Sequence, residues 1–361
     1  MSNISPEKLE MHDSFWKRIP MKRPLMTFHT SDRFPYDKMR ASRALMKHGL
    51  VITPDMIDVD AFVDQTEEQI SFRVGNNIHS DSIRGVSPFG GIPWMECLLG
   101  CGVVAMEHSF ISVPCYKSPG DPDNLPVSTQ WLEKYKEFLE KYSTRFGDRY
   151  PLTETLMRGC LDTYGALIGQ EDMIYALYDE PDIAAAMLDR INQVYVDMVN
   201  LTLTYSRKIA GGMLHPYGIW TPGTVNQFQE DLCALVTPQQ MRDFVIPLHN
   251  RMCSQFDYNG IHTHPTSYHV MDEQISVGKL QLVQVQKDEG DPPVFNRLEV
   301  FEKIQKSGKC LYIGGDFSLD EIDALITTLD ISGLAFSIML DKEASAQQYF
   351  DFICEKCQNK S

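Results

Sequence analysis

The stretch that decides the fold is KCLYIGGDFSLDEIDALITTLDISGLAFSI, residues 309–338. It begins with a short apolar run at 309–313 and ends with another at 333–338. Between them, Ser318 precedes Glu321 by three residues, which is the capping-box signature of a helix start. A strand, a helix and a second strand in this order predict two parallel strands of one sheet.

Six further short runs predict the remaining strands. They are residues 24–28, 82–92, 150–157, 212–219, 259–264 and 281–285. Helical periodicity fills residues 171–205, where Pro181 divides the pattern into two helices, and Thr237-Pro238 begins another helix. The sequence therefore predicts strands that alternate with helices over most of its length.

Eight such units in 361 residues favour a closed (β/α)₈ barrel, the TIM barrel, over an open sheet. We expect residues 1–23 to be an N-terminal extension and residues 24–361 to be a single barrel domain. The alternative, a doubly wound sheet, is disfavoured because no glycine-rich turn follows the first predicted strand.

Composition limits the possible partners. The hydrophobic content of 43% can fill a large core, and the net charge is −16. An acidic chain is a poor ligand for nucleic acid or for an anionic membrane surface, because both need clustered Lys and Arg. No run of 18 apolar residues is present, so no membrane span is expected.

The nine cysteines are scattered and follow no secretory signal pattern. This usage is typical of reduced thiols, and we expect a cytoplasmic protein. Cys354 and Cys357 form a single CxxC near the end of the chain, which is weak support for a metal or redox site.

Two histidines, His262 and His264, end one of the predicted strands. Because side chains alternate along a strand, both imidazoles face the same side. In a barrel this is the mouth, where reactions take place. Paired imidazoles are typical Zn²⁺ ligands, so we expect a metal here. The alternative is that both histidines bind substrate or transfer protons directly, with His269 supporting them from the next helix.

Acidic and aromatic side chains are expected at the same edge. Glu230 and Asp231, Asp288, and Asp316 each follow a predicted strand, where a carboxylate either takes part in chemistry or caps the next helix. Aromatic residues near strand ends favour an apolar, flat-walled pocket. These residues are Phe89, Trp94, Tyr217, Trp220 and Phe336.

From about Pro24 to Ile338 the chain resembles the uroporphyrinogen decarboxylase-like superfamily. Residues 237–247 look like the helix before strand five of that family, and residues 159–188 resemble its helical stretch after strand three. His262-Thr-His264-Pro stands where the family has a His-x-Cys-Gly-like sequence. The resemblance implies one barrel with its active site at the carboxyl ends of the strands.

Two departures argue against tetrapyrrole decarboxylation. The decarboxylases have a Phe-Ser-Asp-Ile sequence whose Asp binds the pyrrole nitrogens, whereas residues 89–92 here read Phe-Gly-Gly-Ile. They also have an Arg-Gln-Ala-Gly-Arg-Tyr sequence with two arginines for carboxylates. Residues 29–35 here read His-Thr-Ser-Asp-Arg-Phe-Pro, which retains at most Arg33.

The chain is closer in character to the corrinoid-dependent methyltransferases of the same superfamily, which include the methyltransferase component of anaerobic O-demethylases. In that branch a His and a Cys at strand five, with a Cys near strand eight, hold zinc. His262 matches the His, His264 replaces the first Cys, and Ser337 stands near the second Cys. A site without thiolate leaves more positive charge on the metal, which favours a Lewis-acid role.

The resemblance implies transfer of a methyl group from a small methylated substrate, with a methoxylated aromatic as the specific expectation. The acceptor would be the cobalt of a cobalamin or related corrinoid on a partner protein. The alternatives are a decarboxylase of a porphyrinogen or related acid, and a non-catalytic tetrapyrrole- or corrinoid-binding protein. A monomer and a homodimer are both compatible with the sequence.

The expected site residues follow from these arguments. The catalytic residues expected are His262, His264, Glu96 and Asp316, with Zn²⁺ held by the two histidines. The substrate-binding residues expected are His29, Arg33, Trp94, Arg158, Tyr217, Trp220 and Asp288.

Overall fold

The computed structural model describes residues 4–30, 40–75, 80–288, 290–341 and 345–360. Within them, seven strands form one sheet in which every neighbouring pair is parallel. In spatial order the strands are β1 (Leu25–Thr30), β12 (Leu334–Leu340), β11 (Cys310–Asp316), β10 (Leu282–Gln286), β9 (Tyr258–Thr263), β8 (Val225–Gln229) and β5 (Met157–Arg158).

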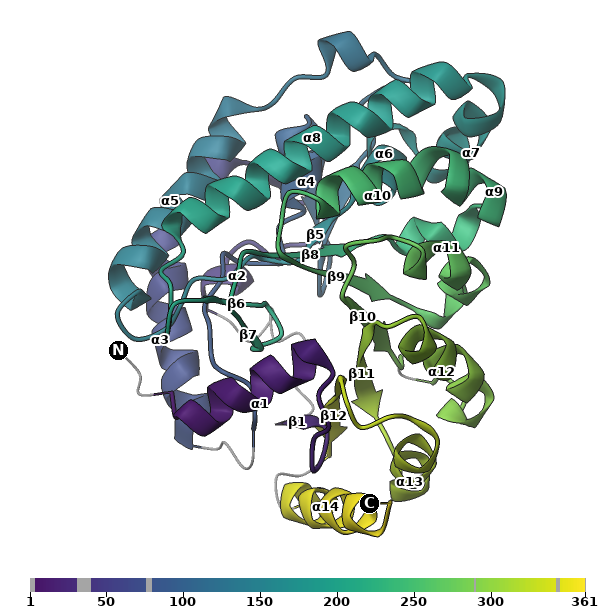
Figure 1. Ribbon diagram of the computed structural model, residues 1–361. Coiled ribbons are helices and arrows are strands. Elements are labelled where there is room, and N and C mark those ends of the chain that lie inside the picture. Colours follow the sequence, from purple (N-terminus) through teal and green to yellow (C-terminus); the bar gives the residue numbers. More distant parts are fainter. Residues whose placement is uncertain (1–3, 31–39, 76–79, 289, 342–344, 361) are drawn as a thin grey trace.

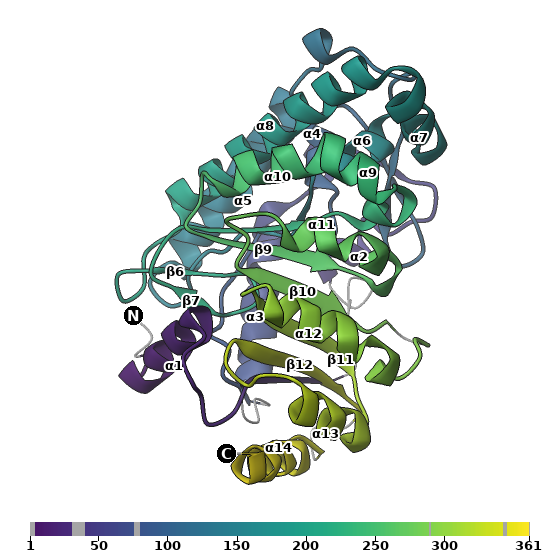
Figure 2. The ribbon, with the colours of Figure 1, turned by 45° about the vertical axis from the view of Figure 1, so that its right-hand side comes forward.

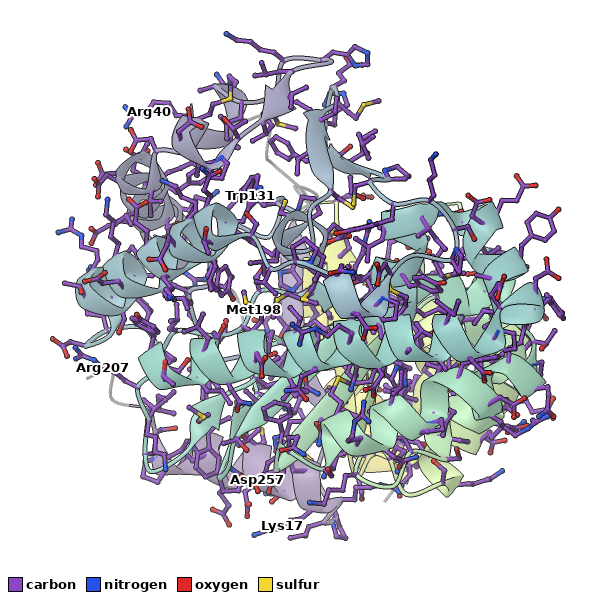
Figure 3. All side chains as sticks on the ribbon, turned by 90° about the horizontal axis from the view of Figure 1, so that it is seen from above. Lys17, Arg40, Trp131, Met198, Arg207 and Asp257 are labelled. Carbon is purple, nitrogen blue, oxygen red and sulfur yellow. The ribbon has the colours of Figure 1, made fainter. Side chains whose placement is uncertain are left out.

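Helices connect consecutive strands and lie along one side of the sheet, which we call its outer face (Figure 1). The main ones are α3 (Val59–Gly75), α5 (Thr129–Phe146), α6 (Cys160–Ile168), α7 (Gln170–Asp179), α8 (Pro181–Tyr205), α10 (Ile246–Cys253), α12 (Leu298–Lys306), α13 (Leu319–Thr328) and α14 (Ala346–Lys360). Shorter ones are α2 (Arg40–Arg43), α4 (Trp94–Leu98), α9 (Pro238–Gln240) and α11 (Met271–Ile275), and a π-helical segment, Met241–Val245, joins α9 to α10. Figure 3 shows α8, which carries Met198, running past α5, which carries Trp131.

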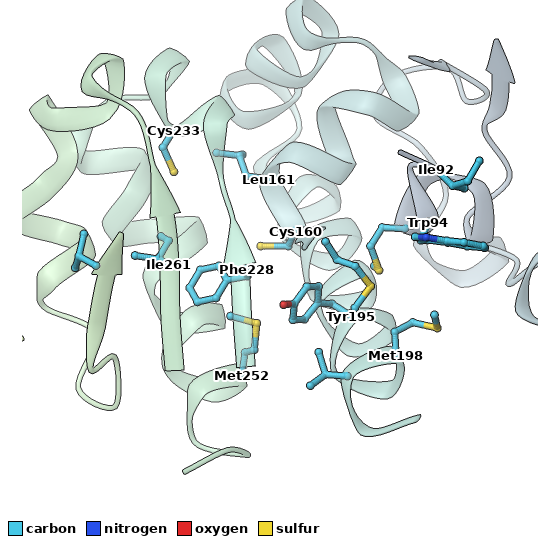
Figure 4. Packing of buried hydrophobic residues seen from close by; sticks show 14 of the residues in the cluster. Ile92, Trp94, Cys160, Leu161, Tyr195, Met198, Phe228, Cys233, Met252 and Ile261 are labelled. Carbon is cyan, nitrogen blue, oxygen red and sulfur yellow. The ribbon is translucent and has the colours of Figure 1, made fainter. Parts of the chain in front are cut away.

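The core lies between the outer face and these helices. Phe228 of β8 and Ile261 of β9 are 0% and 1% exposed, and Figure 4 shows Phe228 between Ile261 and Tyr195 of α8, next to Met252 of α10. The Tyr195 hydroxyl donates to the backbone oxygen of Gln227 at 3.0 Å, which ties the helix to the strand. The outer face therefore packs against the helices, and a functional site is expected on the opposite, inner face.

The amino edge of the sheet is covered by α1 (Pro6–Lys17), as Figure 2 shows. Trp16 packs against Tyr258 with ring centroids 5.1 Å apart, and the Cys310 thiol donates to Phe15 O at 3.2 Å. Tyr258 and Cys310 are the first residues of β9 and β11. Substrate access is therefore expected at the carboxyl edge, where the strands end.

A hairpin of β6 (Met213–Leu214) and β7 (Trp220–Thr221) joins α1 at the amino edge. Its loop carries Tyr217 onto the inner face, where the ring stacks on Tyr312 at 4.9 Å. A separate antiparallel sheet consists of β2 (Val51–Ile52), β3 (Gly102–Ala105) and β4 (Phe110–Val113).

The α/β prediction is confirmed, but the closed ring of eight strands is not observed among the described residues, where the sheet is open. The run predicted at 82–92 contributes a single parallel bridge, from Val86 to Leu152. Residues 212–219, predicted as the fourth strand, form part of the β6–β7 hairpin instead, and β8 takes that position in the sheet. The strand β8 reads Val-Asn-Gln-Phe-Gln, so it lacks the apolar run on which the prediction relied.

Several local predictions are confirmed. The helical pattern of 171–205 is divided at Pro181, Thr237 caps a helix that begins with Pro238, and Ser318 forms a capping box. In the part of the chain that the structure describes, no helix has both the length and the apolar character needed to cross a bilayer.

Candidate functional site

Strand register aligns a row of polar side chains on the inner face. Arg158 pairs with Gln229, Gln229 with His262, and His262 with Gln284 across four adjacent strands. Because side chains alternate along each strand, all four share one face, opposite to that of Phe228 and Ile261. This row lies near the carboxyl edge, where ligands of parallel sheets bind.

The orientation of the His262 ring is fixed by Gln284. The Gln284 side-chain nitrogen donates to Val285 O at 3.1 Å, so its Oε1 faces His262 and can only accept. His262 therefore donates through Nδ1–H, and the Tyr217 hydroxyl donates to the same Oε1 at 3.2 Å. Burial lowers the pKa of His262 below its ordinary value, so the ring is neutral at pH 7 with a lone pair on Nε2.

His264 is oriented in the same way by a carboxylate. Its Nδ1 lies 2.6 Å from Asp288 Oδ2, so Nδ1–H donates to the anion. The two rings stand nearly perpendicular, at 87°, with their Nε2 atoms 2.9 Å apart. When both Nδ1 atoms carry the proton, two lone pairs face each other, and a cation between them relieves the repulsion.

Asp231 completes the group. Its Oδ2 accepts from the side-chain amide of Gln229, and its Oδ1 lies 3.8 Å from His264 Nε2. Among the described residues this Oδ1 is buried and has no hydrogen-bond partner. A buried carboxylate oxygen without a partner is costly, which points to a ligand that the site is built to hold.

Asp231, His262 and His264 fit a divalent metal ion. One donor atom from each lies within 4.8 Å of the other two. Ligand atoms about 2.1 Å from a tetrahedral Zn²⁺ stand roughly 3.4 Å from one another, a value that the observed 2.9 and 3.8 Å bracket. Two histidines, each donating its other ring N–H to an oxygen, with one carboxylate, are an established ligand set for catalytic zinc.

Glu96 and Arg158 form an ion pair at the β5 side of the row. Arg158 Nη1 lies 2.8 Å from Glu96 Oε1, and the side chains are 47% and 1% exposed, respectively. Glu96, with Asp162 and Asp231 nearby, outweighs burial and raises the pKa of Arg158. The buried carboxylate therefore holds a permanent cation at the carboxyl edge.

The remaining edge residues that were predicted lie on other strands. Asp316, the last residue of β11, is exposed, and its backbone oxygen accepts from Lys287 Nζ at 2.7 Å. His29 is exposed near the carboxyl end of β1. Arg33 lies outside the described residues.

Two predicted pocket aromatics lie elsewhere. Trp94 is 2% exposed and packs on Tyr135 and Phe138 of α5, and Figure 4 shows it beyond Met198, apart from the strand residues Phe228 and Ile261. Trp220 lies in β7 at the amino edge, where its backbone oxygen accepts from Trp16 Nε1. Neither indole reaches the His262–His264 group.

Three functional contacts were missing from the predicted site residues: Asp231, Gln229 and Gln284. Asp231 was recognised as a strand-end acid but was indistinguishable from a helix cap. The signal for the glutamines is polar residues at every second position of a buried strand, in Gln227-Phe-Gln229 and in Gln284-Val-Gln286.

A second group, Cys160, Glu230 and His249, also brings three donor atoms together, but it is fully buried. Glu230 accepts from the backbone nitrogens of Leu161 and Asp162 at 3.1 and 3.0 Å, at the start of α6. This group therefore stabilises the fold, because Glu230 accepts hydrogen bonds from backbone N–H groups that have no partner within the first turn of α6.

Neither protein-family models nor curated protein sequences match this chain. Among solved structures, it is similar to a methyltransferase from Methanosarcina mazei, with a TM-score of 0.62 over 96% of this chain and 98% of that chain. The two sequences are 12% identical. At that identity the likeness shows the fold alone: both chains share one α/β architecture over almost their full lengths.

Proposed function

We propose that this protein is a metal-dependent methyltransferase that removes a methyl group from a small methylated substrate, best a methoxylated aromatic. The acceptor in this proposal is the cobalt of a corrinoid carried by a partner protein. The observation that carries the proposal is the convergence of two imidazole Nε2 atoms and the partnerless Asp231 Oδ1 at the carboxyl edge. The fold shared with a methyltransferase supports the same reaction class.

Each of the site's own residues has a defined task in this reaction. His262, His264 and Asp231 would hold Zn²⁺, which when bound acts as a Lewis acid on the oxygen that loses its methyl group. Such help is needed because phenolate is a poor leaving group, since the pKa of its conjugate acid is near 10. Gln284 and Asp288 keep His262 and His264 in the tautomer that carries its proton on Nδ1. Arg158 can donate its remaining N–H groups to an anionic substituent of the substrate.

The charges at this edge favour a small substrate over a porphyrinogen. Asp231, Asp288 and Asp316 lie there, while Lys287 pairs with the buried Glu321 at 3.0 Å. A macrocycle with many carboxylates would meet repulsion from these acids.

The test is a spectroscopic assay with a reduced corrinoid protein and a panel of methoxybenzenes, methylamines and methanol. We expect the spectrum of the methylated corrinoid to form with methoxybenzenes, and His264→Ala to abolish it. Trp220→Phe, at the amino edge, is the matched control and should retain activity. A response to methylamines or methanol alone would overturn the substrate, and no methyl transfer from any donor would overturn the reaction.

A further inference from the structure

A pair of thiols lies outside the candidate metal site, at the base of the β3–β4 hairpin. Cys101 directly precedes β3, and Cys115 follows β4 after one intervening residue. Their Sγ atoms are 3.6 Å apart, within hydrogen-bond distance for sulfur. Cys101 is 3% exposed, whereas Cys115 is exposed to solvent. One sulfur is thus open to reagents, and the other lies directly behind it.

The contact makes the two sulfurs chemically different. The hydrogen bond shared with Cys101 lowers the pKa of Cys115, and the same bond raises the pKa of Cys101. Cys101 Sγ also lies 3.5 Å from Ala166 O, and Cys115 Sγ lies 4.0 Å from Leu99 O. An exposed thiol with thiolate character beside a buried thiol is the arrangement of an attacking and a resolving cysteine.

We propose that Cys101 and Cys115 form a modification site at which a peroxide-class oxidant produces an intramolecular disulfide. In the first step the Cys115 thiolate attacks one peroxide oxygen, the O–O bond breaks, and a sulfenic acid and hydroxide form. In the second step the Cys101 sulfur attacks the sulfenic sulfur and the S–O bond breaks. The hydroxyl group that leaves takes up the Cys101 proton and departs as water. The two sulfurs lose two electrons in total, and one peroxide becomes two waters.

The bond would join two segments that are hydrogen-bonded to the helices α4 and α6. The Cys101 backbone nitrogen donates to Glu96 O of α4 at 2.9 Å, and the Cys115 nitrogen donates to Leu167 O of α6 at 2.9 Å. The helix α4 carries Glu96, and α6 begins two residues after Arg158. Oxidation would therefore link a segment bonded to α4, which carries Glu96, to a segment bonded to α6, which follows Arg158 of β5, and we expect a higher melting temperature.

The experiment treats the reduced, purified full-length chain with a small excess of hydrogen peroxide. It follows the intact mass, the free-thiol count, the cross-linked peptides and the melting temperature. We expect the loss of two of the nine thiols, a cross-link between Cys101 and Cys115, and a rise in melting temperature that dithiothreitol reverses.

Variants separate the two roles. In Cys115→Ser no disulfide should form, whereas in Cys101→Ser a sulfenic acid that dimedone traps should accumulate at Cys115. Cys354→Ser, which removes another partly exposed thiol, is the matched control and should oxidise like the wild type. Retention of all nine thiols in the wild type, a cross-link at other cysteines, or unchanged disulfide formation in Cys115→Ser would each overturn the proposal.

Discussion

Removing the Asp288 carboxylate should weaken metal binding without removing a metal ligand. Asp288 Oδ2 accepts from His264 Nδ1 at 2.6 Å and so directs the Nε2 lone pair toward the ligand group. Hydrogen bonds to charged groups contribute about 1.5–3 kcal/mol, which corresponds to about tenfold to hundredfold in affinity. Because the Asp288 side chain is 44% exposed, solvent screening places the expected loss for Asp288→Ala near the lower end, about tenfold.

Asp288→Asn provides a graded comparison. The amide oxygen can still accept from Nδ1–H, but the charge is gone. Charge-assisted bonds are about twice as strong as neutral ones, so the variant should retain roughly half the energy and lose about threefold in affinity. Competition titrations with a chromophoric zinc chelator measure these constants.

Asp272→Ala is the matched control, because Asp272 is an exposed acid of α11 that pairs with Lys303 at 2.9 Å, away from the site. Its metal affinity should equal that of the wild type. Asp288 does not support His264 as proposed if Asp288→Ala binds zinc as tightly as the wild type, or if Asp288→Asn binds zinc more weakly than Asp288→Ala.

Three other predictions concern pH, substrate charge and packing. Buried His12 accepts from Trp220 N–H and donates to Asp81 O, and burial lowers its pKa to about 4. Because the unfolded chain binds this proton more readily than the folded chain, the contribution of His12 to the free energy of unfolding should be constant above about pH 6.5 and fall by on the order of 3 kcal/mol toward pH 4. Denaturant titrations across this range should show a smaller slope in His12→Leu than in the wild type. Arg158→Met should raise the KM for a methoxybenzoate about tenfold and leave that for a neutral methoxybenzene unchanged, which steady-state kinetics with both substrates measure. Phe228→Ala should lower the free energy of unfolding by about 3–5 kcal/mol in urea titrations, because the ring is fully buried between β8 and the helices.

The sequence indicates strands β10, β11 and β12, because apolar residues predominate in each of them. It also indicates the helix starts at Thr237 and Ser318, because both carry cap residues. Strand β8 is missed, because polar residues occupy three of its five positions, among them the inner positions Gln227 and Gln229. A strand that lines a site departs from the apolar pattern for functional reasons.

The site was predicted only in part for a related reason. His262 and His264 are close in sequence, so strand alternation alone brings them together. Asp231 is the first residue of a 3₁₀ helix that follows another strand, β8. Its distance from His264 depends on the β8–β9 register, which no local pattern encodes. Trp94 and Trp220 were predicted as pocket walls because they lie beside turns. In the structure Trp94 packs in the core and Trp220 lies at the amino edge.

The most direct test of the central claim is the metal content of the purified chain after reconstitution with Zn²⁺ and removal of the excess. By elemental analysis, we expect about one ion per wild-type chain and far less in His264→Ala and Asp231→Ala. Asp316→Ala, in which an exposed residue of another strand is changed, should hold as much as the wild type. Absence of metal from the wild type, or equal metal in all four proteins, would show that Asp231, His262 and His264 do not form a metal site, and the His262–His264 contact would then be a hydrogen bond through a shared proton.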